Sequence, residues 1–318
     1  MSFASDARGE LTRERVDQPC CARAELAAAL LFGGGIAYRG RERYRLRLVS
    51  PDAFVARHFF TILKNFFGVT AQISTLRTDQ LRGQTRYQLL PPEEDSAAIL
   101  DACGLLDAQA LFGVRPVPKE EAIPYACCRK AFLRGAFLLA GAVSNPERSY
   151  HMEFAAPSEE LADFVIMLLN YFEISAKKTC RKAKFVVYLK GGEQIADALT
   201  LIGAKNAMMA LENVRVKKEV RNRINRQINC DERNLARQVE NAQAQLEDIA
   251  LIEREIGLDR LPASLREMAR VRAEHADDSL AALGEFCDPP IGKSGVNSRL
   301  RRLREIAASL REGEETNI

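Results

Sequence analysis

The sequence predicts an α+β fold for the N-terminal part of the chain and an all-α fold for the remainder. An apolar helix with one pattern of small residues occurs twice, and the segments after each copy alternate between strand and helix periodicity in the same order. Beyond Gly203 the composition changes to helix-forming and basic residues. We therefore expect a pseudo-twofold tandem of two αββαββα units, followed by an all-α domain.

The repeated helices begin near residues 20 and 127. Each opens with two adjacent cysteines, runs apolar for about three turns and stops at glycine, a common C-terminal signal of a buried helix. The matching small residues are Ala24 and Ala28 in the first copy and Ala131 and Gly135 in the second. Because their i, i+4 spacing places them on one face, we expect the two helices to pack closely on each other.

The likeness between the two halves continues beyond these helices. Tyr44 matches Tyr150, and Gly104 matches Gly203 at the end of each half. Such a sustained likeness is an internal repeat, which predicts helix, two strands, helix, two strands and helix in each unit. The repeats cover residues 20–104 and 125–203, the segment between them contains three prolines, and residues 1–19 form a tail or a short helix.

Arginine alternates with apolar residues in one predicted strand of the first repeat. The outward positions are Arg43, Arg45 and Arg47, and the inward ones are Tyr44, Leu46 and Leu48. A period of two is typical of a strand with one buried face, so the arginines form a row on the open face of the sheet. The same alternation at 84–90 places Arg86 on that face. A solvated edge is the alternative; we favour contacts with phosphate, because like charges at this spacing repel unless an anion balances them.

The second repeat differs on the corresponding face. Ser149, His151 and Glu153 stand where the first repeat has arginines. Its basic residues come later, around its second predicted hairpin, and Lys184 is the one that we include among the predicted DNA contacts. The two repeats would therefore contribute unequally to any contact with DNA, and the first would bind more strongly.

The helix of the second repeat resembles the motif that names the LAGLIDADG homing endonucleases. Residues 133–141 read Leu-Arg-Gly-Ala-Phe-Leu-Leu-Ala-Gly, and 26–34 are a weaker counterpart. In that family the acid just before the final glycine holds the metal ions for DNA cleavage. Gly33 and Ala140 occupy those positions here, and neither can bind a metal. The resemblance implies a LAGLIDADG-like domain over residues 20–205 without catalytic residues.

The C-terminal residues 257–312 predict a helix-turn-helix. Pro262 begins one helix, and Ser279 and Ser294 cap the next two. The apolar stripe of the last helix consists of Val296, Leu300, Leu303 and Ala307. Its other face is polar and basic, as in a DNA recognition helix. The predicted DNA contacts on this helix are Lys293, Ser294, Asn297, Ser298, Arg299, Arg301 and Arg302.

Residues 206–256 predict a basic helical linker between the two domains. Apolar residues keep a rough stripe along it, and arginine and lysine make up much of the rest. A solvated linker and a clamp on the DNA backbone both fit this pattern, and the sequence leaves the choice open. Residues 313–318 are predicted to form a tail.

Two degenerate LAGLIDADG-like repeats followed by a helix-turn-helix resemble the WhiA family of bacterial transcription regulators. Residues 222–235 are similar to a signature segment of that family, and 293–301 to its recognition helix. The resemblance implies a sequence-specific DNA-binding regulator of sporulation or cell division genes, without enzymatic activity. The implied partner is double-stranded promoter DNA, with the transcription machinery or another regulator as a further one. The oligomeric state is left open, a monomer included.

Two other functions stay open. One is an active homing-type endonuclease, which Gly33 and Ala140 oppose. The other is a regulator whose N-terminal domain senses a protein or a ligand instead of DNA. The formal charge of +3 is too small to choose between them, because a net value hides local patches. No leader segment and no apolar run of transmembrane length is evident, so we expect a cytoplasmic, nucleoid-associated protein without membrane contact.

Eight cysteines raise the question of a metal or redox site. Adjacent pairs are not the Cys-x-x-Cys spacing of zinc sites, and a cytosolic chain argues against disulfides. We therefore expect no metal and no cofactor, and interpret the paired cysteines as small buried residues at helix starts. If the two repeated helices lie side by side, however, Cys20, Cys21, Cys127 and Cys128 gather at one end of them.

The three histidines are scattered along the chain. No nucleophile or acid near His58, His151 or His275 makes a catalytic triad. We interpret all three as ordinary surface or half-buried side chains, and expect no catalytic residue in this chain.

Overall fold

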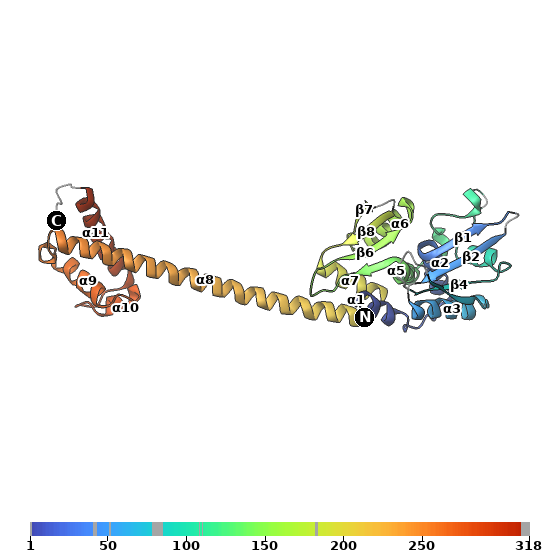
Figure 1. Ribbon diagram of the computed structural model, residues 1–318, viewed down its shortest axis with the longest axis horizontal. Helices are drawn as coiled ribbons and strands as arrows, with labels where there is room; N and C mark the ends of the chain where they lie inside the picture. The colour runs from blue at the N-terminus through green and yellow to red at the C-terminus, as the bar shows by residue number, and fades with distance from the viewer. Residues whose placement is uncertain are drawn as a thin grey trace. The chain divides into compact units, whose positions relative to one another are not determined.

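The computed structural model describes residues 2–40, 43–50, 52–77, 85–107, 109, 111–181 and 184–312. The chain divides into two compact units, Met1–Lys218 and Glu219–Ile318. Figure 1 traces their elements, and helix α8 (Lys205–Glu255) contributes residues to both. The predicted tail 313–318, together with Glu42, lies outside the described residues. Among the described helices, none combines the length and the apolar character that crossing a membrane requires.

The first unit consists of a short N-terminal helix, α1 (Phe3–Leu11), and two repeats with the same order of elements. The first repeat contains α2 (Pro19–Gly33), β1 (Gly34–Tyr38), β2 (Tyr44–Ser50), α3 (Ala53–Phe67), β3 (Gln72–Arg77), β4 (Thr85–Leu90) and α4 (Ser96–Ala102). The second contains α5 (Ala126–Ala140), β5 (Gly141–Val143), β6 (Met152–Ala156), α6 (Glu159–Tyr171), β7 (Lys177–Arg181), β8 (Lys184–Leu189) and α7 (Gly192–Ile202). This order confirms the predicted αββαββα tandem.

Each repeat forms one antiparallel sheet of four strands. The strand orders are β1-β2-β4-β3 and β5-β6-β8-β7, so the two repeats share one topology. In the first sheet Leu48 lies opposite Leu89, and in the second Phe154 lies opposite Val187; all four side chains are buried. Because paired residues point to the same side, one face of each sheet covers the core and the other is left open.

Helices α2 and α5 form the centre of the core. Ala24, Ala28 and Ala131 are buried along their contact, as the small-residue pattern predicts. Gly135 is needed at the crossing, because a Cβ built on it would collide with the backbone carbonyl of Glu25 and lie 3.0 Å from the Cβ of Ala28. The backbones of α2 and α5 thus approach each other closely at Gly135, and this contact joins the two repeats.

The second unit has its own small core. It is formed by the end of α8 with α9 (Ala263–Glu274), α10 (Leu280–Glu285) and α11 (Lys293–Glu312), and a short 3-10 turn, η4 (Leu258–Arg260), precedes α9. The buried apolar residues that meet there include Ile252, Met268, Leu283, Val296 and Leu303. These contacts hold α11 against α9 and α10, the arrangement of a helix-turn-helix.

The two predicted serine caps have different outcomes. Ser279 caps α10, since its hydroxyl accepts a hydrogen bond from the backbone amide of Ala282 at 3.3 Å. The prediction for Ser294 is wrong. The carbonyl of Gly292 accepts the first helical hydrogen bond, from the amide of Val296 at 3.2 Å, so Ser294 lies inside the first turn of α11.

Candidate nucleic-acid interface

A row of arginines lies on the open face of the first sheet. The side chains of Arg43, Arg45 and Arg47 are exposed, whereas the alternating residues Tyr44, Leu46 and Leu48 are buried. The neighbouring strand β1 places only small residues beside the row, with Ala37 opposite Arg45 and Gly35 opposite Arg47. The Nε atom of Arg47 lies 3.4 Å from the position that a Cβ of Gly35 would take. Small neighbours therefore leave room over the guanidinium groups.

Strand β4 adds a fourth arginine to this face. Val49 of β2 pairs with Gln88 of β4, so Gln88 and Arg86, two residues away, point to the same side as Arg47. Arg86 is half-buried there. Within the described part of the chain, none of these four arginines forms an ion pair, so their charge is available to an anion. Gln84, the first residue of the strand predicted at 84–90, lies outside the described residues.

The open face of the second sheet has a different chemistry. His151 and Glu153 are in contact, with 3.0 Å between Nε2 and Oε2, and the ring of His151 stacks on that of Tyr188. The exposed Lys184 pairs with Arg181 at the end of the hairpin. Lys178 is held between the carboxylates of Glu159 and Asp163, whose hydrogen bonds raise its pKa. The exposed positive charge of this hairpin therefore lies at its end, at Arg181 and Lys184, rather than beside Glu153.

The positions that carry the metal-binding acids in LAGLIDADG endonucleases lie at the ends of α2 and α5. Gly33 is the last residue of α2 and Ala140 the last of α5. A Cβ built on Gly33 would lie 2.8 Å from the Cγ of Leu139, which is too close for any side chain without movement of that leucine. An acid at Gly33 would therefore require Leu139 to move, and neither Gly33 nor Ala140 has a side-chain oxygen to offer a metal.

Helix α11 presents a polar and basic face in the second unit. The exposed residues among those predicted to contact DNA are Lys293, Ser294, Asn297, Ser298, Arg301 and Arg302. Lys293, Asn297 and Arg301 also line a pocket of about 940 Å³ beside α8 and α10. Arg301 and Arg302 lie 3.6 and 3.0 Å from the carboxylate of Glu305, but such exposed ion pairs are weak and exchange readily for phosphate.

Arg299 differs from the other predicted contacts on α11. Its guanidinium donates to the carboxylate of Glu267 at 2.9 Å and lies 3.4 Å from the carbonyl of Ser264. Both partners belong to α9, and the Arg299 side chain is only 22% exposed. Arg299 therefore fastens α11 to α9, which leaves its neighbours to face outward.

All three histidines are half-buried, as predicted, and each lies beside an acid. His58 lies 2.6 Å from Glu25, and His275 lies 3.1 Å from Asp278, in addition to the contact of His151 with Glu153. Glu25 is fully buried in α2, where sequence reasoning overlooked it. A single acid inside an apolar helix, matched by the single basic residue Arg134 in the middle of the other, was the available signal.

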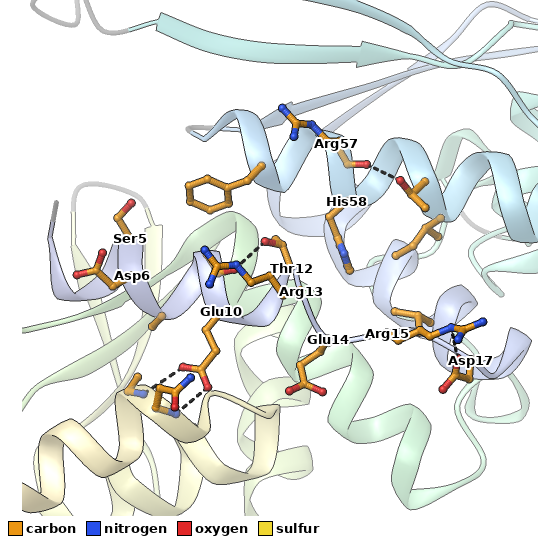
Figure 2. Close-up of a pocket in the computed structure, with 18 of the residues that line it drawn as sticks. Ser5, Asp6, Glu10, Thr12, Arg13, Glu14, Arg15, Asp17, Arg57 and His58 are labelled. Carbon is orange, nitrogen blue, oxygen red and sulfur yellow. Dashed lines mark hydrogen bonds and ion pairs between the residues drawn. The ribbon is translucent and has the colours of Figure 1, made fainter.

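A separate pocket of about 1200 Å³ lies between α1, α3 and the start of α8 (Figure 2). Glu10 closes one side, because its carboxylate accepts hydrogen bonds from the backbone amides of Asn206 and Ala207 at 2.7 and 3.1 Å. Exposed charged side chains such as Arg13 and Arg57 line the pocket together with apolar ones such as Phe54. None of the predicted DNA contacts lines this pocket.

Comparison with known proteins gives one consistent family over nearly the whole chain. The WhiA N-terminal LAGLIDADG-like domain matches residues 19–106, the WhiA LAGLIDADG-like domain matches 129–221, and the WhiA C-terminal HTH domain matches 224–307. A protein of Desulforamulus reducens named "Probable cell division protein WhiA" is 41% identical, with 99% of this chain and 98% of its own length covered. Its namesake in Alkaliphilus metalliredigens is 40% identical, with 96% and 98% covered.

The crystal structure of full-length WhiA from Thermatoga maritima has the same fold. The match covers 97% of this chain and 98% of that one, with a TM-score of 0.61 at 22% sequence identity. The structure agrees with these matches, since it contains the repeated sheets, the C-terminal helix-turn-helix and motif positions without acids. Because the relatives are about 40% identical over their full length and the three domain models match in order, this chain belongs to the WhiA family.

Proposed function

We propose that this protein is a sequence-specific DNA-binding regulator of transcription that binds promoters and does not cleave them. The exposed polar and basic face of α11 carries the proposal, because its opposite face is buried in a helix-turn-helix core. In such proteins the outward face of the recognition helix contacts base edges in the major groove. Ser298 and Arg301 take that role here, while Lys293, Ser294, Asn297 and Arg302 contact the backbone or flanking bases.

The first sheet supplies contacts that do not depend on sequence. Arg43, Arg45, Arg47 and Arg86 bind phosphates, which is supported by their shared face and by the lack of carboxylate partners among the described residues. Lys184 adds a weaker contact from the second sheet. Phosphate contacts position a protein on DNA and add affinity, and base contacts choose the site.

The absent motif acids support a binding role without cleavage. Two-metal hydrolysis needs carboxylates around the attacking and leaving oxygens, and Gly33 and Ala140 supply none. Since relatives are named "Probable cell division protein", we assign the regulated promoters to cell division genes, with sporulation genes as a second set. The protein acts on the nucleoid in the cytoplasm, together with the transcription machinery or another regulator.

Selection of genomic fragments by the full-length protein, followed by footprinting, tests this function. We expect a discrete footprint in promoters, including promoters of cell division genes, at protein concentrations that leave random DNA of equal length unbound. Equal affinity for selected and random fragments would contradict sequence-specific regulation. A sharp footprint confined to genes of other processes would contradict only the assignment to cell division and sporulation.

A further inference from the structure

Four cysteines from the two repeats converge at one end of the central helix pair. Cys20 and Cys21 lie in the first turn of α2, and Cys127 and Cys128 in the first turn of α5. All four Sγ atoms lie within 4.8 Å of one another. Four sulfur atoms bound tetrahedrally at about 2.3 Å from one zinc ion lie about 3.8 Å apart, so small side-chain rotations would bring this cluster to that geometry.

Burial in the core does not explain this cluster. Cys21 and Cys128 are buried, as small residues at a helix start would be, but Cys20 is half-buried and Cys127 is exposed. An exposed cysteine contributes little to packing, and a cysteine cluster open to solvent is prone to oxidation. The exposed side at Cys127 also gives an ion a route from solvent to the two buried sulfur atoms.

The N-termini of α2 and α5 lie at the end of the helix pair that holds the four cysteines, so their partial positive charge lies beside any thiolates formed there. Gln18 at the start of α2 and Tyr125 at the start of α5 make no side-chain capping hydrogen bond. The first-turn amides of both helices thus keep their partial positive charge at the end where the thiols lie, and this charge stabilises thiolates.

We propose that Cys20, Cys21, Cys127 and Cys128 form a four-thiolate site for a thiophilic divalent cation, with zinc as its occupant. Zinc forms four Zn–S bonds, each bound thiol loses its proton to solvent, and the site carries a net charge of −2. No coordination position is left for water or substrate, so the ion is structural. It ties the first repeat to the second at the helix ends opposite Gly33 and Ala140. Each helix contributes two adjacent cysteines to this site. The Cys-x-x-Cys spacing, which is typical of zinc sites whose ligands come in pairs from one short segment, is therefore not required here.

Titration of the full-length protein with Co²⁺ tests this site without any substitution. The protein is reduced, stripped of metal with a chelator and titrated without oxygen. We expect thiolate-to-cobalt charge-transfer absorption that saturates at about one ion per chain and disappears when one equivalent of Zn²⁺ is added. Zinc should also raise the Tm of the stripped protein. Absence of thiolate–cobalt absorption in the reduced protein overturns the proposal.

A pair of matched variants assigns the ion to these cysteines. Cys20→Ser/Cys127→Ser removes the two less buried members, and Cys180→Ser/Cys230→Ser removes two exposed cysteines elsewhere. We expect the first variant to lose more than about 100-fold in zinc affinity and the zinc-dependent rise in Tm, while the second matches wild type. Equal retention of zinc by both variants, or equal loss, overturns the assignment. Disulfides among the four cysteines in freshly purified protein, with no zinc bound after reduction, also overturn it.

Discussion

Arg134 of the second repeat donates a hydrogen bond to Glu25 of the first, with 3.0 Å between Nε and Oε2. The other oxygen of Glu25 lies 2.6 Å from Nε2 of His58, so one buried carboxylate joins α2, α5 and α3. Burial would raise the pKa of Glu25, but the hydrogen bond with His58 and the charge of Arg134 outweigh it and lower that pKa. The charged form is therefore the native one.

Replacing Glu25 by alanine should destabilise the first unit. The change leaves Arg134 and His58, which are 17% and 7% exposed, without their shared anion. Breaking a buried ion pair by removing one partner costs about 3–5 kcal/mol. Urea unfolding followed by circular dichroism measures the loss. Glu147→Ala, at an exposed position, serves as the control and should stay within about 0.5 kcal/mol of wild type; a similarly small effect of Glu25→Ala would contradict the structural role of Glu25.

Acid should remove the contribution of Glu25 to stability. Because its folded pKa is lowered, the unfolded state takes up its proton first as the pH falls. The contribution is complete well above the ordinary glutamate pKa of about 4.3 and is lost as the pH falls through the lower folded value. The difference in unfolding free energy between wild type and Glu25→Gln should therefore shrink below about pH 4. A difference that is constant from pH 7 to pH 3 would show that the charge has no role.

Arg301→Ala should weaken specific binding more than non-specific binding. A bidentate contact with a base edge contributes about 1–3 kcal/mol of discrimination, and Arg301 is exposed on the outward face of α11. Competition gel shifts with target and random DNA measure the two affinities. Arg254→Ala removes another exposed arginine of the second unit and is the matched control. Equal weakening on both DNAs would mean that Arg301 contacts phosphate only.

The triple variant Arg43→Ala/Arg45→Ala/Arg47→Ala should bind every sequence more weakly and keep its site preference. The slope of log affinity against log salt should flatten by about one unit for each phosphate that the protein no longer neutralises. Folding should survive, since these side chains point away from the buried face of β2. Removal of Arg13, Arg15 and Arg57, which are exposed at the pocket in Figure 2, changes the net charge equally and is the control.

If this triple variant retains the wild-type affinity and salt slope, the first sheet is not a DNA-binding surface. The helix-turn-helix would then carry the binding alone. The first unit would be better explained as a receptor for a protein or a ligand.

The protein should not cut DNA that it binds. Supercoiled plasmid carrying a bound site should stay intact with Mg²⁺ or Mn²⁺, because the motif positions offer glycine and alanine in place of metal-binding acids. Agarose gels with a plasmid lacking the site as control report nicking. Specific nicking that Glu42→Gln or Glu147→Gln abolishes would show that acids outside the motif have taken over cleavage.

Periodicity along the chain is enough to predict much of this molecule. The alternation of arginine with Tyr44 and Leu46 predicts both strand β2 and the exposed row, because side chains of a strand point to opposite faces whatever lies around it. The small residues of α2 and α5 likewise predict a close helix contact, which Gly135 confirms. The absence of acids at Gly33 and Ala140 is read directly from the motif.

Tertiary packing decided which polar and charged side chains meet across the core. Glu25 is buried between Arg134 and His58, and Arg299 contacts Glu267, although these partners are far apart in the sequence. The four cysteines gather only because the helix pair forms, a condition that the sequence analysis had to assume. The start of α11 also differs from the sequence prediction. The carbonyl of Gly292, rather than a cap at Ser294, accepts the first hydrogen bond of this helix. Local patterns specify which way a side chain points from its own helix or strand. The partner that it meets is specified only when burial of the two sheets and the helix pair brings the elements together.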